Sequence, residues 1–166
     1  GKIFSDVMPI DQLAYAYNGN QLKSVTDSSY SPQGFNDGAN NNAEYGYDVN
    51  GNMTRDDHKG ITNILYNHLI LTTEIVFGTN KIEYLYNATG QKIKKMVYPQ
   101  TGSVVETEYL DGFQYSKASD TTAVVLDFFP HAEGYVKVSG ESTDYDYSYV
   151  YNYLDHLGNV RLSYGI

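Results

Sequence analysis

Apolar and aromatic residues alternate with polar ones in short runs along this chain, and Gly, Asn, Asp or Pro residues bound most of the runs. A period of two places the apolar side chains on one face of a β-strand. Spacings of three and four residues, which would indicate an amphipathic helix, are nearly absent. The pattern predicts strands over 12–17, 44–48, 61–66, 73–77, 81–86, 92–98, 104–109, 123–129, 135–138, 144–154 and 160–164.

A short motif recurs four times. Each copy has two tyrosines separated by one residue, then Asn or Asp, then Gly, then Asn or Gln, and the copies begin at Tyr15, Tyr45, Tyr84 and Tyr151. Tyr47 lies 19 positions before Tyr66, which lies 20 before Tyr86, so a unit spans two short strands and two turns. Repetition of this kind marks an array of supersecondary units. The sequence therefore predicts an all-β fold, an antiparallel sheet of consecutive hairpins that twists or curls like a segment of a shell or barrel.

The turn positions of the motif have a physical role. The first side chain (Asp48, Asn87 or Asp155) can accept a hydrogen bond from the backbone two residues on. The glycine (Gly51, Gly90 or Gly158) supplies the left-handed conformation that closes the turn, so a β-branched residue there should strain or break the hairpin. In the first copy, Asn18-Gly19 predicts a two-residue turn. The motif positions taken as candidate sites are Tyr47, Asp48, Gly51, Asn52, Tyr86, Asn87, Gly90, Asp155, His156, Gly158, Asn159 and Arg161.

The organisation predicted is one domain over residues 1–166, because the chain has a suitable length and no sharp change in composition. Residues 28–42 are rich in Ser, Asn and Gly and predict a long loop, and residues 116–122 predict a shorter one. The chain begins Gly1-Lys2 and stops within the pattern at Ile166, so we expect a fragment of a longer protein.

Composition and charge exclude several classes of function. A net charge of −9 argues against nucleic acid as a partner, since the only basic cluster, 92–95, is short and fits a solvated strand face. The chain has no cysteine, which excludes disulfide and thiolate chemistry. No apolar run approaches the length of a membrane span, and no signal peptide is present.

Candidate chemistry is sparse. Asp48, Asn50 and Asn52 resemble the start of a calcium loop, but Met53 and Lys59 occupy the positions that need Gly and Glu. The four histidines lack metal-ligand spacing, and Asp111-Gly112 fits a hairpin turn better than a protease turn. Arg161 and Arg55 follow turn glycines, where each can pair with the acidic residue of its own turn, Asp155 or Asp48. We expect no catalysis, no cofactor and no metal site.

Tyrosine supplies much of the apolar surface, with 18 copies in the chain. Five of them occupy every second position of one strand and project to one face: Tyr145, Tyr147, Tyr149, Tyr151 and Tyr153. Sheets use aromatic faces for packing, and we favour that interpretation. The alternative is a carbohydrate-binding or adhesive module that uses this tyrosine strip.

The block over 149–164, YVYNYLDHLGNVRLSY, resembles the end of the core region of the RHS/YD-repeat family, which has an Asp-His-Leu-Gly-Asn-x-Arg signature. Residues 128–135, FFPHAEGY, are similar to the preceding segment of bacterial members, especially those of Bacteroidetes. The runs 47–53 and 82–90 resemble the YD repeat itself. The resemblance covers most of the chain from about residue 10 to 164, although the middle repeats are irregular.

The resemblance implies a segment of a hollow shell built of stacked hairpins, in a large surface-exposed or secreted bacterial protein. Such a shell serves toxin encapsulation or contact with other cells. The family's self-cleaving aspartates lie beyond the block at 155–161, so no catalytic residue is carried over. The implied partner is the remainder of the same polypeptide, further repeats and a C-terminal effector. Two open sheet edges would also favour self-association of the piece.

Overall fold

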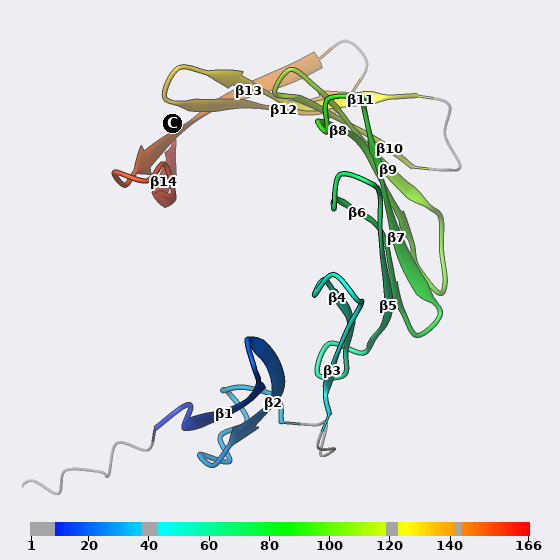
Figure 1. The fold of residues 1–166 in the computed structure, drawn as a ribbon. Coiled ribbons are helices and arrows are strands. Elements are labelled where there is room, and N and C mark those ends of the chain that lie inside the picture. The colour runs from blue at the N-terminus through cyan, green and yellow to red at the C-terminus, as the bar shows by residue number, and fades with distance from the viewer. Residues whose placement is uncertain (1–8, 38–42, 119–122, 142–143) are drawn as a thin grey trace, which may run out of the picture. The chain divides into compact units, whose positions relative to one another are not determined.

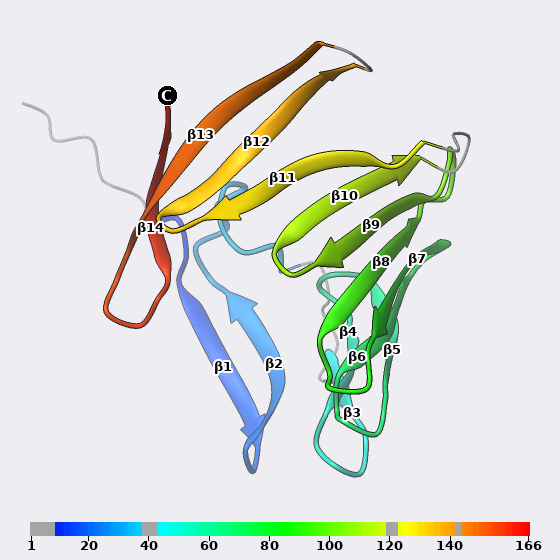
Figure 2. The same cartoon turned by 90° about the horizontal axis from the view of Figure 1, so that it is seen from above.

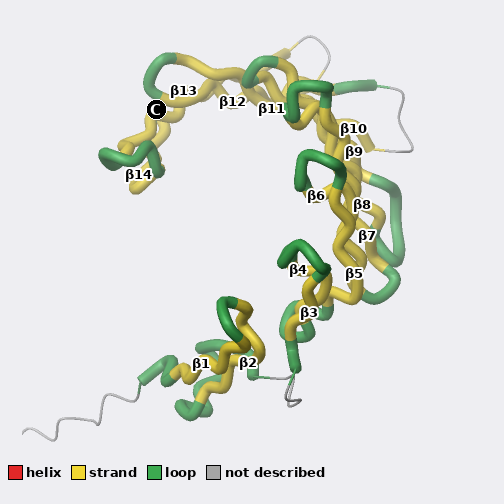
Figure 3. Tube along the Cα trace, in the orientation of Figure 1, coloured by secondary structure: helices red, strands yellow, loops and turns green. Residues whose placement is uncertain are grey.

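The computed structural model describes residues 9–37, 43–118, 123–141 and 144–166, which form strands, turns and loops without any helix (Figures 1 and 3). These residues contain fourteen strands: β1 Leu13–Asn18, β2 Gln21–Asp27, β3 Tyr45–Tyr47, β4 Met53–Asp56, β5 Ile61–Tyr66, β6 Thr72–Phe77, β7 Asn80–Tyr86, β8 Lys92–Tyr98, β9 Val105–Leu110, β10 Phe113–Ala118, β11 Val125–His131, β12 Gly134–Glu141, β13 Asp144–Leu154 and β14 Val160–Gly165. No helix among the described residues is long and apolar enough to cross a membrane. The fold is all-β, as predicted.

Two sheets contain all the described strands. β1 and β2 form a two-stranded antiparallel sheet, and β3 to β14 form a twelve-stranded sheet in which neighbours follow chain order. The larger sheet is not closed among the described residues, because β3 and β14 are its edge strands. The backbone divides into two compact units, residues 1–81 and 82–166. The prediction of a single domain stays a prediction.

The first unit contains the β1–β2 hairpin and the strands β3 to β6. β1 pairs with β2 from Leu13 opposite Asp27 to Asn18 opposite Gln21, so the two loop residues are Gly19 and Asn20. Gly19 has a φ of +63°. The predicted hairpin turn exists, but Asn18 belongs to the strand and the left-handed residue opens the two-residue loop.

The second unit contains the long strands β12 and β13, which lie side by side (Figure 2). A Cβ atom on Gly134 or Gly140 of β12 would clash with the carbonyl of Val150 or Asp144 on β13, so glycine is needed for the close approach. At the β9–β10 connection, Asp111 and Gly112 have φ values of +48° and +89°. They join Leu110 to its partner Phe113, which is the hairpin turn predicted there.

All eleven predicted strands exist; three have the predicted ends, and the ends of the others differ by at most three residues. The sequence interpretation missed β2, β4 and β10. The predicted loop over 116–122 is wrong at its start, because Ser116 pairs with Thr107 and with Val125 inside the sheet. In the long loop predicted over 28–42, residues 28–37 contain no strand, and residues 38–42 lie outside the described residues.

The buried apolar core is small. Among the described residues only Val25, Ile64, Val136 and Val138 are buried apolar side chains, at 2–9% exposure. Large apolar side chains stay exposed on many strands. Because burial of apolar surface supplies the main favourable term in folding, the sheet depends unusually heavily on its main-chain hydrogen bonds and on its turns.

Candidate functional site

The motif positions form one recurring turn. In the turns that begin at Asp48, Asn87 and Asp155, the first side chain accepts hydrogen bonds from two backbone N–H groups, two and four residues on, at 2.8 to 3.0 Å. The glycine N–H donates to the carbonyl of the first residue at 3.0 to 3.1 Å. The backbone N–H of the first residue of the turn donates to the carbonyl of the fifth residue at 2.9 Å. The side chain thus accepts hydrogen bonds from two backbone N–H groups that would otherwise need water as their partner.

The turn glycines have the conformation that the motif predicts. Gly51, Gly90 and Gly158 have φ values of +86°, +83° and +82°. This left-handed region is easily reached by glycine and costs other residues free energy. The glycine three residues after the Asn or Asp therefore has a structural role in each of these turns.

A further copy of the turn lies at Asn67 and was missed. The Asn67 side chain accepts from Leu69 N–H at 2.9 Å and from Leu71 N–H at 3.0 Å. Ile70 stands where the other copies have glycine, with a φ of +60°. Without a glycine the segment gives no turn signal in the sequence. The spacing of roughly twenty residues, together with Tyr66, was the signal that could have located it.

Three of these hairpins have a bulge at the same distance from the turn. We count the Asn or Asp that begins the turn (Asp48, Asn67 or Asp155) as residue one. The residue directly before it pairs with residue six, and the residue two positions before it pairs with residue eight. The seventh residue, Thr54, Thr73 or Arg161, is the extra one. A bulge raises the local right-handed twist, so the repeated turn also repeats a twist.

Asp155 and Arg161 form the ion pair that the sequence suggested. Arg161 Nε donates to Asp155 Oδ2 at 2.8 Å, and Asn159 also donates through its backbone and side chain. The Asn159 N–H, then its side chain and then Arg161 lower the pKa of Asp155. His156 and Asn159 are exposed. In the first turn, hydrogen bonds from the Asn52 side chain and from the backbone N–H groups lower the pKa of Asp48.

The pairing suggested for Arg55 is wrong. Arg55 Nε lies 3.1 Å from Asp57 Oδ1, and its guanidinium also donates to the Ala43 carbonyl. Asp48 instead accepts from Asn52. Arg161 is the extra residue of its bulge, whereas Arg55 lies one position after the extra residue Thr54 and so one residue further from its turn, which explains the different partner.

The tyrosines of the motif also tie strands together. The Tyr47 hydroxyl donates to the Leu22 carbonyl at 2.9 Å, and the equivalent Tyr66 hydroxyl donates to the Met53 carbonyl at 2.6 Å. Tyr86 is half-buried, and burial raises its pKa. The two hydroxyl hydrogen bonds connect β3 to β2 and β5 to β4.

The basic cluster at 92–95 is partly engaged with its own sheet. Lys94 Nζ lies 2.9 Å from Glu106 and 2.8 Å from Glu108, and these hydrogen bonds raise the pKa of Lys94. Lys92 Nζ lies 4.2 Å from the centre of the Tyr84 ring. Two of its three lysines are thus held by neighbouring strands.

The tyrosine strip is largely exposed. Tyr145, Tyr147, Tyr149 and Tyr153 are 46–59% exposed. Tyr151 is half-buried, its ring stacked on Tyr164 at 5.4 Å and edge-on to His131 at 5.1 Å. Three rings of the strip therefore contact His131 on β11 or Tyr164 on β14, while much of the surface of the strip stays in solvent.

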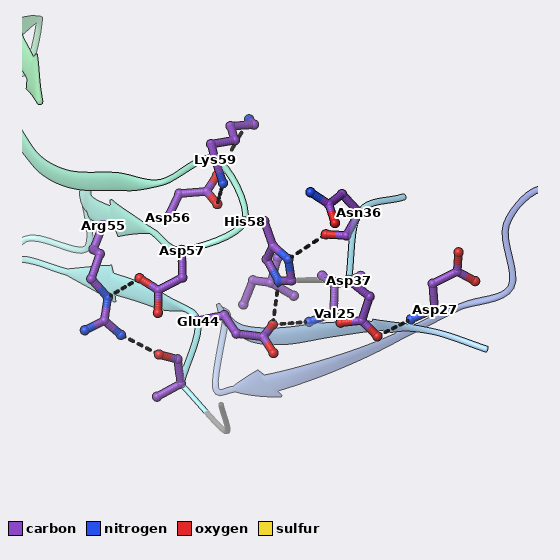
Figure 4. Close-up of polar contacts among 12 residues, drawn as sticks. Val25, Asp27, Asn36, Asp37, Glu44, Arg55, Asp56, Asp57, His58 and Lys59 are labelled. Carbon is purple, nitrogen blue, oxygen red and sulfur yellow. Dashed lines mark hydrogen bonds and ion pairs between the residues drawn. The ribbon is translucent and has the colours of Figure 1, made fainter. Parts of the chain in front are cut away.

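A buried polar cluster in the first unit was missed by sequence reasoning. Glu44 and His58 have side chains that are only 3% and 5% exposed, and His58 Nε2 lies 2.8 Å from Glu44 Oε2 (Figure 4). The same oxygen accepts from Val25 N–H at 2.8 Å, and His58 Nδ1 lies 3.1 Å from the Asn36 carbonyl. Both imidazole nitrogens thus face acceptors, an arrangement that favours the doubly protonated ring.

This cluster joins four segments of the first unit. It connects β2, the loop at Asn36, the residue before β3 and the β4–β5 turn. Burial alone lowers the pKa of His58, but the hydrogen bonds to Glu44 and Asn36 and the charges of Glu44 and Asp56 outweigh it, so the pKa is raised. The Phe35 ring lies 4.7 Å from the imidazole. A buried pair of this kind fixes position, because its separation would leave buried charge unpaired.

No group of three or more His, Asp or Glu side chains among the described residues is placed to hold a metal ion. The candidate positions of the sequence lie in separate turns and in the strands that flank them. Comparison of the chain with family models, with curated proteins and with solved structures finds no match.

The left-handed conformation of Ile70 leads to a prediction about the stability of the fold. We expect Ile70→Gly to raise the free energy of unfolding by about 1 kcal/mol, because it removes the steric cost of an L-residue in this region. Ile70 is 62% exposed, so little burial is lost. Urea unfolding followed by circular dichroism measures the change. Leu69→Gly, one position earlier and with no left-handed φ, is the matched control and should destabilise; equal effects of the two substitutions would contradict the account.

The buried pair predicts a pH dependence. A raised His58 pKa means that the folded protein holds this proton more tightly than the unfolded chain, whose value is near 6.5. The stabilisation is therefore fully present below about pH 6.5 and is lost as pH rises through the folded pKa. Urea unfolding of wild type and His58→Gln across this range should show the difference between them shrinking as pH rises. The exposed His68→Gln is the control; a constant difference for His58→Gln would refute the prediction.

Proposed function

We propose that this chain is wall material of an RHS-type shell, a structural segment of a large surface-exposed or secreted bacterial protein that encapsulates a toxin or contacts other cells. The observation that carries the proposal is the repeated turn. Three copies at Asp48, Asn87 and Asp155, and a fourth at Asn67, share the same main-chain and side-chain hydrogen bonds. Each one adds the next strand beside the last in chain order.

Two further observations support a wall. The described residues bury few apolar side chains, as expected for a single layer of sheet that no second layer covers. Strands added in chain order let a sheet lengthen by any number of units, which a container requires. The family resemblance of residues 149–164 supplies the specific identity of the container. In this proposal the chain itself performs no catalysis.

The complete reading frame that encodes this chain tests the proposal. We expect further units of about twenty residues beside this segment and an unrelated C-terminal effector. Electron microscopy of the expressed polypeptide should then show a hollow particle. A reading frame without further units, or a solid particle, would overturn the proposal.

A second candidate function is carbohydrate binding or adhesion through the tyrosine strip. The observation that favours it is exposure, since four of the five rings are about half open to solvent. Aromatic faces of this kind can stack on sugar rings or dock an adhesion partner.

Glycan-array binding separates the two functions. A wall segment should bind no glycan, and the second function predicts binding that Tyr149→Ala and Tyr151→Ala each reduce at least tenfold with an unchanged circular dichroism spectrum. Tyr30→Ala is the matched control, because this tyrosine is 91% exposed and lies in a loop of the first unit. Loss of binding in the control as well would rule out a specific role for the strip.

A further inference from the structure

The tripeptide Asn-Gly-Asn occurs twice in this chain, at 18–20 and at 50–52, each time at the tip of a hairpin. Asparagine followed by glycine is especially prone to lose its side-chain amide, because glycine has no Cβ that hinders attack by its own backbone nitrogen. Asn18 and Asn50 are both exposed, so access to water does not distinguish them. Any difference in their reactivity must therefore come from the two turns.

The turn that begins at Asp48 holds the second copy. Gly51 N–H donates to the Asp48 carbonyl at 3.1 Å, and Asn50 N–H donates to Asp48 Oδ1 at 2.9 Å. Hydrogen bonds, first from the Asn52 side chain and then from backbone N–H groups that include Gly51, lower the pKa of Asp48. The nitrogen that would attack Asn50 thus already donates a hydrogen bond and lies beside a negative charge. That charge opposes loss of the amide proton and formation of an anionic intermediate.

The first copy has none of these restraints. Asn18 ends β1 and pairs with Gln21, so Gly19 and Asn20 form a two-residue loop (Figure 2). Gly19 N–H donates to no backbone carbonyl among the described residues. A Cβ atom built on Gly19 would have nothing within 4 Å, and the loop contains no acidic residue. The Gly19 nitrogen is therefore free to lose its proton and to turn toward the Asn18 side chain.

We propose that Asn18 is a site of spontaneous deamidation, and that the turn at Asp48 protects Asn50 from the same reaction. The deprotonated Gly19 nitrogen forms a bond to the side-chain carbonyl carbon of Asn18. The carbon–nitrogen bond of the side-chain amide breaks, and its nitrogen leaves as ammonia with a proton taken from water. Water then opens the five-membered succinimide ring by breaking one of its two carbon–nitrogen bonds. The product is an aspartate or an isoaspartate at position 18, and no oxidant or reductant is needed.

This modification would alter a turn, the kind of feature on which the fold depends. Both products add a negative charge to a chain that already carries −9. Isoaspartate also lengthens the backbone by one carbon, which a two-residue hairpin loop does not accommodate without loss of the Asn18–Gln21 pair. The next residue of β2, Leu22, provides the carbonyl that accepts from the Tyr47 hydroxyl of β3 at 2.9 Å. The isoaspartate form should therefore weaken the hairpin beside β3.

Peptide mapping by mass spectrometry tests the proposal on the intact chain, incubated at neutral pH. We expect position 18 to convert at least tenfold faster than position 50 in the folded protein. In concentrated urea the two rates should become equal, because the tripeptides are identical and the turns are lost. Equal rates in the folded protein, or a difference that persists in urea, would overturn the proposal. Since the proposal concerns these two turns alone, such a failure would leave the shell proposal standing.

An alanine substitution tests the protecting role of the turn. Asp48→Ala removes the charge and the acceptor of two backbone N–H groups, and should raise the rate at position 50 at least fivefold without changing the rate at position 18. Asp155→Ala is the matched control, because it removes the equivalent acceptor from a turn without an Asn-Gly dipeptide and should change neither rate. An unchanged rate at position 50 in Asp48→Ala would contradict the proposal.

A second variant keeps this test decisive if Asp48→Ala alters the circular dichroism spectrum. Asp48→Asn removes the charge and keeps a side-chain acceptor, since Asn87 makes the same two hydrogen bonds in its own turn. Its rate at position 50 should also rise, because the negative charge beside the Gly51 nitrogen is gone. A folded Asp48→Asn variant with the wild-type rate at position 50 would contradict the electrostatic protection.

Discussion

The interaction on which the structure depends is the hydrogen bonding of one Asn or Asp side chain to two backbone N–H groups of its own turn. In the described residues this arrangement recurs at Asp48, Asn67, Asn87 and Asp155. It fixes the turn, and the turn fixes the register between the strand before it and the strand after it. With so few buried apolar side chains, correct register is what keeps each strand paired along its length.

The bulge that follows three of these turns extends this local rule to the sheet. Because the extra residue falls at the same motif position after Asp48, Asn67 and Asp155, each unit receives a similar increase in twist. Repetition of one local geometry is how a chain can build a curved surface from units that each bury little. This gives the shell proposal a physical basis that does not depend on the family resemblance.

Turn chemistry determined how much of the fold could be predicted. The strands 61–66, 92–98 and 144–154 were predicted with their observed ends, since clear alternation and turn residues bound them. β2, β4 and β10 were missed because their sequences alternate weakly or are short, and pairing with neighbours decides their conformation. The turn at Asn67 was missed because Ile70 adopts by context a conformation that sequence reasoning assigns to glycine.

The roles of residues that act through tertiary contacts could not be predicted from the sequence. Glu44 and His58 lie 14 positions apart and gave no motif, yet they form the buried pair that joins four segments of the first unit. The same holds for Arg55, which lies one residue further from its turn than Arg161 does and pairs with Asp57. Positions whose role is local, such as Gly51 and Asp155, were identified correctly as turn residues.

Amide hydrogen exchange measured residue by residue is the most direct test of the central claim. For the second N–H donor of each turn, the account predicts slow exchange although these turns lie at the surface; these amides belong to Asn52, Leu71, Gln91 and Asn159. Asp155→Ala should release the Asn159 amide alone and leave the other three protected. Exchange of all four amides at the rate of an unfolded peptide in the wild type would contradict the account.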